Sequence, residues 1–123
     1  MTTKNTKKTA QTSNPIAESL IGKQVIVRAN VAGVHFGTVK AVDFAVSTIQ
    51  LENAYRLWRV YTRDSTGSIS DIAANGLKAP LDKHSIGARL DEVVIVNPEG
   101  LEIAVCADCV LETIEQASPS YSK

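Results

Sequence analysis

The sequence predicts a small α+β domain that is mostly β, with an antiparallel sheet or a partly closed barrel and two short helices. The length of 123 residues fits one domain. Short β-branched runs recur between turn-forming residues, which is the pattern of strands and hairpins. Only two segments of helical length place their apolar residues on one stripe.

The first half of the domain is predicted to consist of strands that follow one helical turn. Pro15 favours a turn of helix over residues 16–21, and Gly22 closes it. Turn-prone Ala32-Gly33 and Asp43 interrupt the extended runs that come next. The strands expected in this half are residues 24–28, 34–42, 47–51 and 54–62.

The second half is predicted to switch from helix to strands and back to helix. A helix capped by Ser68 is expected to end at Asn75-Gly76. The residues of the turn Asn97-Pro98-Glu99-Gly100 separate two apolar runs. Residues 107–116 form a second helix, because Val110, Leu111 and Ile114 share one helical stripe. The strands expected in this half are residues 85–90, 92–96 and 101–105.

Both ends of the chain are predicted to be flexible and to lie outside the compact domain, residues 16–116. Residues 1–15 and 117–123 contain few apolar side chains, so burial cannot offset the entropy lost on ordering them. Lys4, Lys7 and Lys8 make the first of these segments basic.

Charge and composition exclude several broad classes of protein. Lys and Arg balance Asp and Glu at a formal net charge of +0, which removes a whole-molecule attraction for nucleic acid. Nucleic acid is therefore a less favoured partner than a small anion bound locally. No apolar run approaches the length of a membrane span and no secretory signal is visible. We expect a cytoplasmic protein without a membrane partner.

Motifs of the common enzyme classes are missing, so we expect no catalytic residue, no cofactor and no metal. The chain has no P-loop, dinucleotide-binding, nucleophile-elbow or zinc-protease motif. His35 lies between Gly33 and Gly37, which permit close backbone approach or a bulge. It is interpreted as a strand histidine beside a turn, with a role in ligand binding as the alternative.

Cys106 and Cys109 form the only cysteine pair, in a C-x-x-C spacing. A structural zinc needs four ligands, and no second cysteine pair is present. A redox pair at the start of a helix is the other reading of this spacing. We interpret both residues as reduced, partly buried thiols without chemistry, because free cysteine packs as a small hydrophobe.

The segment AYRLWRVY, residues 54–61, interleaves aromatic and basic side chains. Alternation along a strand places Tyr55, Leu57 and Arg59 on one face and Arg56 and Trp58 on the other. Arginine suits phosphate, and an aromatic ring stacks on a base for about 1–3 kcal/mol. The combination indicates a nucleotide site. The alternative is that Leu57 and Trp58 are core residues and both arginines extend to solvent.

Three strings of the sequence carry a family resemblance: VIVR at 25–28, AGVHFG at 32–37 and AYRLW at 54–58. They resemble a functionally uncharacterised family of small proteins in tailed-phage and prophage genomes, whose pattern reads V-I-V-R, A-G-V-H-F-G and A-R-R-L-W. Tyr55 stands where this pattern has a first arginine. The resemblance covers residues 20–115 and implies a phage or prophage origin, hence the host cytoplasm, but no reaction.

The combined prediction is a non-enzymatic, homo-oligomeric phage or prophage binding protein. Its ligand is a nucleotide-like immune signal, such as a cyclic nucleotide or an ADP-ribose derivative, which it sequesters to counter host defence. Arginines are expected to hold phosphate and rings to stack. The predicted ligand-binding residues are Arg28, His35, Phe36, Tyr55, Arg56, Trp58 and Arg59. Two alternatives stay open: a virion or host-factor interaction module, and a nucleic-acid-binding accessory protein.

Overall fold

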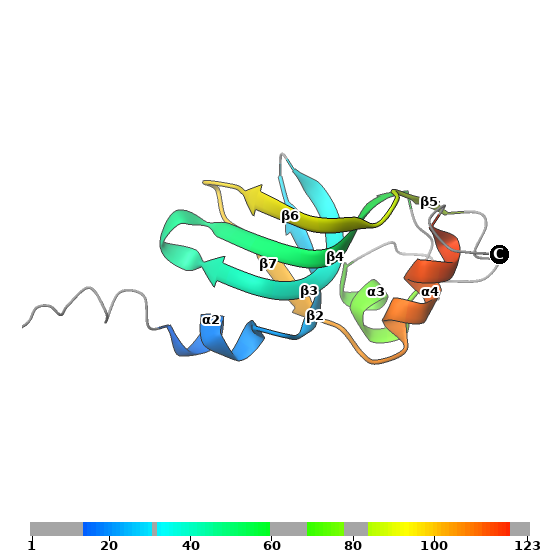
Figure 1. Cartoon of the computed structure of the whole chain (residues 1–123), viewed down its shortest axis with the longest axis horizontal. Helices are drawn as coiled ribbons and strands as arrows, with labels where there is room; N and C mark the ends of the chain where they lie inside the picture. Colours follow the sequence, from blue (N-terminus) through cyan, green and yellow to red (C-terminus); the bar gives the residue numbers. More distant parts are fainter. Residues whose placement is uncertain (1–13, 31, 60–68, 78–83, 119–123) are drawn as a thin grey trace, which may run out of the picture.

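The computed structural model describes residues 14–30, 32–59, 69–77 and 84–118, and its six strands form one antiparallel sheet that is not closed (Figure 1). The predicted α+β, mostly β class is confirmed, and the sheet is open rather than a closed barrel. The strands are β2 (Gln24–Ala29), β3 (Gly33–Asp43), β4 (Thr48–Arg59), β5 (Ser85–Ile86), β6 (Leu90–Val96) and β7 (Glu102–Val105).

β4 is the strand to which most of the sheet is attached. The order is β5-β4-β3-β2-β7, and β6 also pairs with β4, along the half that β5 leaves free. Residues 47–51 and 54–62 were predicted as two strands, which is wrong within the described residues. Asn53 adopts a φ of 51° and the pairing with β3 shifts there, so a bulge lets one strand continue.

The segment predicted as a strand over residues 85–90 is divided instead. Only Ser85 and Ile86 pair with β4 as β5, and Leu90 already belongs to β6. Residues 1–13 and 119–123, which include nearly all of both predicted flexible ends, lie outside the described residues, as do Ser68 and the predicted end of β4 at Thr62.

Three helices accompany the sheet: α2 (Pro15–Leu20), α3 (Ile69–Asn75) and α4 (Val110–Ala117). α2 begins where the Asn14 side chain accepts hydrogen bonds from the backbone N–H groups of Ile16 and Ala17. α3 ends as predicted, because Gly76 adopts a φ of 77° and its N–H donates to the carbonyl of Ile72. A short 3-10 helix, η1 (Phe44–Val46), joins β3 to β4.

The two faces of the sheet bury two separate cores. The first core lies under α3 and α4, which contact each other at one end of the sheet (Figure 1). Alternation along each strand sends the intervening residues to the opposite face, where they form the second core with Leu20 of α2. The first core contains Ile26, Phe36, Tyr55, Leu57, Ile69, Ile72, Ala73, Leu77, Ile86, Val110 and Ile114, and the second contains Leu20, Val25, Val27, Ala29, Val39, Ile49, Leu51, Ala54 and Ile95.

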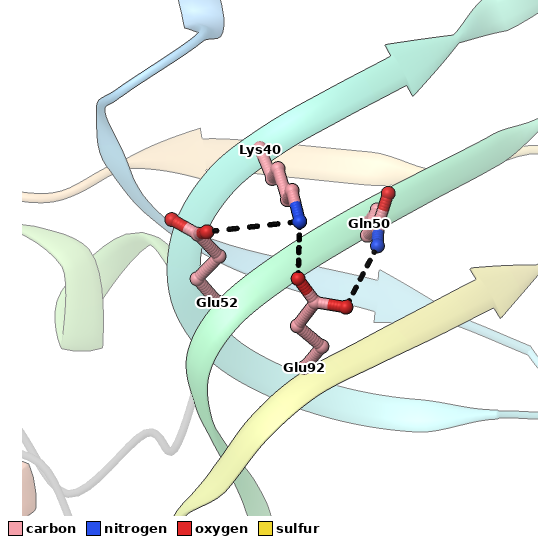
Figure 2. A network of polar contacts seen from close by, with 4 residues as sticks. All are labelled: Lys40, Gln50, Glu52 and Glu92. Carbon is pink, nitrogen blue, oxygen red and sulfur yellow. Dashed lines mark hydrogen bonds and ion pairs between the residues drawn. The ribbon is translucent and has the colours of Figure 1, made fainter.

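Beyond the reach of α3 and α4, the first face of the sheet carries a polar network (Figure 2). Lys40 of β3 forms an ion pair with Glu92 of β6 and lies 4.0 Å from Glu52 of β4. The amide of Gln50 donates to Glu92 over 3.1 Å. The ion pair raises the pKa of Lys40 and lowers the pKa of Glu92, chiefly through their hydrogen bond. The network joins three strands where no helix covers them.

Candidate functional site

Trp58 is the most exposed aromatic residue that the structure describes. Its side chain is 65% exposed, although it stands near the end of a central strand. The guanidinium of Arg56 lies over the indole ring, 4.0 Å from the ring centroid, which is a cation–π arrangement. Arg56 and Trp58 share the strand face predicted from alternation. The indole therefore has one face against a cation and much of its remaining surface in solvent.

Gly33 makes room for the guanidinium of Arg56. A Cβ atom at residue 33 would stand 2.7 Å from one guanidinium nitrogen of Arg56, which is too close. Gly33 also adopts a φ of 86°, a backbone conformation that favours glycine. The guanidinium thus lies close to both the Gly33 backbone and the indole. We call Gly33, Arg56 and Trp58 the Arg56–Trp58 surface.

Arg56 differs from other cations of the sheet because no described carboxylate pairs with it. Arg28 forms an ion pair of 2.7 Å with Glu102, and Lys40 pairs with Glu92. Arg89 lies 3.8 Å from Asp91 and donates to Asn53. Within the part of the chain that the structure describes, Arg56 makes no ion pair. Its charge is oriented by packing and is available to an anionic ligand.

His35 supports this surface from β3, where it is paired with Arg56. The ring is buried, and its Nε2–H donates to the carbonyl of Ala32 over 2.7 Å. Burial lowers the pKa of His35, and the charge of Arg56 lowers it further, while the bond to Ala32 acts in the opposite direction. A neutral histidine here fastens the turn that carries Gly33. The prediction of a strand histidine beside a turn matches this placement.

The structure does not bring all seven predicted ligand-binding residues together. Phe36 and Tyr55 are buried in the first core, with ring centroids 6.3 Å apart, so neither offers a ring to a ligand. Arg28 is paired across the sheet with Val34 and Glu102, on the first face and away from Arg56. The side chain of Arg59 lies outside the described residues. Only His35, Arg56 and Trp58 are gathered at one place.

Comparison with known proteins identifies a family without assigning an activity. A family model described as "Domain of unknown function (DUF6948)" matches residues 22–114, which include the whole Arg56–Trp58 surface. The chain belongs to the DUF6948 family. The predicted membership of an uncharacterised family is confirmed at this level, and the phage origin stays a prediction. No match was found among curated proteins or among solved structures.

The cysteine pair of this DUF6948 chain lies at the junction of β7 and α4. Cys106 follows β7 and Cys109 stands just before α4, so the predicted strand-to-helix placement is correct. Both thiols are free. Burial, with a smaller effect of Cys109, raises the pKa of Cys106 to about 12. A thiol with such a pKa is protonated at neutral pH and is a poor nucleophile.

The described residues of this DUF6948 chain contain neither a candidate metal site nor a helix that could span a membrane. No three His, Cys, Asp or Glu side chains in the described ranges are grouped so that they would hold a metal ion. None of the helices in those ranges combines the length and apolar character needed to cross a membrane.

Sequence reasoning missed two features of the sheet. The exposed network of Lys40, Gln50, Glu52 and Glu92 was not expected, although oppositely charged residues in neighbouring strands were a usable signal. The packing of Gly33 against Arg56 was foreseen only in part. The glycines around His35 indicated close backbone approach, but not which side chain would approach.

Proposed function

We propose that this protein is a non-enzymatic binding protein that captures a small nucleotide-like anion on the Arg56–Trp58 surface. The observation that carries the proposal is the state of Arg56: its guanidinium lies over the indole and close to Gly33, and it has no described carboxylate partner. A guanidinium held this way can donate to phosphate with both of its edges. The exposed indole beside it can stack on a base.

The size of the ligand follows from the distribution of charge. The formal net charge of the chain is +0, so its overall field does not attract a long polyanion. A bounded anion needs only the local cation. We favour a cyclic nucleotide or an ADP-ribose derivative, sequestered in the host cytoplasm to counter an immune response, because the sequence resembles phage and prophage proteins.

The experiment is a ligand panel read by Trp58 fluorescence and thermal stability of the full chain. The panel contains cyclic dinucleotides, cyclic trinucleotides and ADP-ribose isomers. A ligand at 100 times its dissociation constant adds about 2.7 kcal/mol to the free energy of unfolding. Trp58 is the chain's one tryptophan, so fluorescence reports on this surface directly.

Matched arginine variants locate the binding. Arg56→Ala is expected to abolish the response, whereas Arg28→Ala is expected to keep it, because Arg28 is paired with Glu102 on the opposite face. A panel without any response at millimolar ligand would overturn the proposal. Equal loss of binding in both variants would place the ligand elsewhere.

A second candidate function is protein interaction, and the exposure of Trp58 favours it. Tryptophan and arginine are common anchors of protein interfaces, and here they lie side by side at the surface. Detection of the chain in purified virions, or capture of one host protein by wild type and not by Trp58→Ala, would support this function. The nucleic-acid alternative predicts steeply salt-dependent retention on single-stranded DNA.

A further inference from the structure

β6 is an edge strand without the usual protection of an edge. Among the described strands it pairs only with β4, and the pairing keeps one register from Leu90 to Val96. Natural edge strands are commonly blunted by lysine, proline or a bulge, because unpaired backbone groups recruit other strands. Residues 93–96 of β6 are Val, Val, Ile and Val and contain none of these devices.

The side chains of residues 93–96 are apolar on both faces of the strand. Ile95 is buried in the second core, whereas Val94 and Val96 are 56% and 57% exposed on the other face. The same face of the neighbouring strand β4 is polar, because Val94 is paired with Gln50 and Val96 is paired with Thr48. Two exposed valines on an unprotected edge are typical of a surface that another chain covers.

The backbone of the same two valines faces outward. The N–H of Asn97, just after β6, donates to the carbonyl of Ser47 over 3.0 Å. Backbone groups alternate in direction along an antiparallel strand, so Ile95 and Val93 also direct theirs toward β4. Val94 and Val96 therefore direct their N–H and C=O groups to the free edge. The residues that expose apolar side chains thus also offer hydrogen-bonding groups that pair with no other described strand.

We propose that β6 pairs edge to edge with β6 of a second copy of this chain, antiparallel and centred on Val94. In this register Val94 faces its own counterpart, Val93 faces Ile95 and Glu92 faces Val96. Only an antiparallel arrangement suits the charges, because a parallel pair in register would set Asp91 and Glu92 against the same acids of the other copy. Glu92 is already paired with Lys40 of its own chain.

Charge at long range does not oppose a homodimer. The formal net charge of the whole chain is +0, so two copies do not repel each other as highly charged proteins do. The pairing also leaves the Arg56–Trp58 surface uninvolved, since Trp58 is carried by the other end of β4, which pairs with β5 rather than β6. The inference is independent of the proposed ligand.

The test is the mass of the full chain in solution, measured by sedimentation velocity over a wide range of concentration. Wild type is expected to be a dimer. Val94→Lys brings two ammonium groups together at the dimer axis and is expected to raise the dimer dissociation constant by about 100-fold or more. Val96→Glu is a second disrupting variant on the same edge, because its carboxylate would face Glu92 of the other copy. Val105→Lys is the matched control, because Val105 is 51% exposed on β7, an edge strand at the other side of the sheet.

Hydrogen exchange separates this pairing from other ways of covering the edge. The amides of Val94 and Val96 are expected to gain protection as the protein concentration rises. Three results would overturn the proposal: a monomer at every concentration, a dimer that Val105→Lys breaks and the β6 variants do not, or amides of Val94 and Val96 that are protected equally at all concentrations. Circular dichroism confirms that each variant is folded.

Discussion

The two faces of β4 between Tyr55 and Trp58 show how neighbouring residues of one strand acquire opposite roles. Tyr55 and Leu57 are buried beneath α3 and α4 in the first core. Arg56 and Trp58 lie on the opposite face, beyond the second core. There the Gly33 backbone lies close to the guanidinium of Arg56. The difference comes from what covers each face, since the residue types alone mix aromatic and basic side chains on both.

The same contrast separates Arg28 and Arg56, two of the three arginines expected to bind phosphate. Arg28 lies on the first face opposite Glu102, and their ion pair uses its charge. Arg56 lies on the second face against a glycine and an indole, neither of which neutralises it. A residue type therefore predicts a binding role only together with its partner on the adjacent strand.

The largest expected effect compares one aromatic residue from each face. Phe36→Ala removes a ring that is 1% exposed, so it should lower the free energy of unfolding by about 3–5 kcal/mol. Trp58→Ala removes a ring that is 65% exposed, and its effect should be much smaller. Urea denaturation of both variants provides the measurement. Similar losses would mean that Trp58 is packed and not available to a ligand.

An intermediate effect compares two glycines with the same backbone conformation. Gly33 and Gly22 both adopt a φ of 86°, but only at Gly33 would a Cβ meet the Arg56 guanidinium. Alanine at either position should destabilise the protein by about 1–2 kcal/mol through its backbone. The two losses should be similar, because the guanidinium is the end of a flexible side chain and can move away from a Cβ at residue 33. Only Gly33→Ala should change the fluorescence of Trp58, because it displaces Arg56 from the indole.

An unchanged Trp58 spectrum in Gly33→Ala would show that Arg56 does not depend on Gly33 for its position. The Arg56–Trp58 surface would then be a flexible pair of side chains. A flexible guanidinium would lose conformational entropy on binding, which would weaken the case for a preformed ligand site.

The sequence was sufficient to predict the fold class, because strand periodicity and turn residues are local signals. The end of α3 at Gly76 and the turn before β7 follow from such signals. The continuity of β4 does not, since the bulge at Asn53 depends on pairing with β3. The length of β5 was overestimated for a similar reason. The apolar pattern predicts a longer strand, but the pairing with β4 ends after Ile86.

The candidate site was predictable only in part. Alternation alone placed Arg56 and Trp58 on one face. It could not show that Phe36 and Tyr55 would be covered by helices that come later in the chain, nor that Glu102 would meet Arg28. These outcomes depend on contacts between residues far apart in sequence. Sequence patterns therefore identified the strand that carries the site, and the tertiary contacts selected which of its residues remain available.

The smallest expected effect is a pH dependence from His35, which lies beneath the Arg56–Trp58 surface. Burial lowers the pKa of His35 from its ordinary 6.5, so the unfolded chain takes up a proton at a higher pH than the folded one. The free energy of unfolding should therefore fall as the pH drops below 6.5. His35→Gln, whose amide can still donate to Ala32, should lack this loss. Unfolding curves of both proteins above and below pH 6.5 test this difference. The pKa of Glu92 is lowered from 4.5, so Glu92 titrates in a separate pH range. Parallel curves for the two proteins would show that His35 is not buried as a neutral ring.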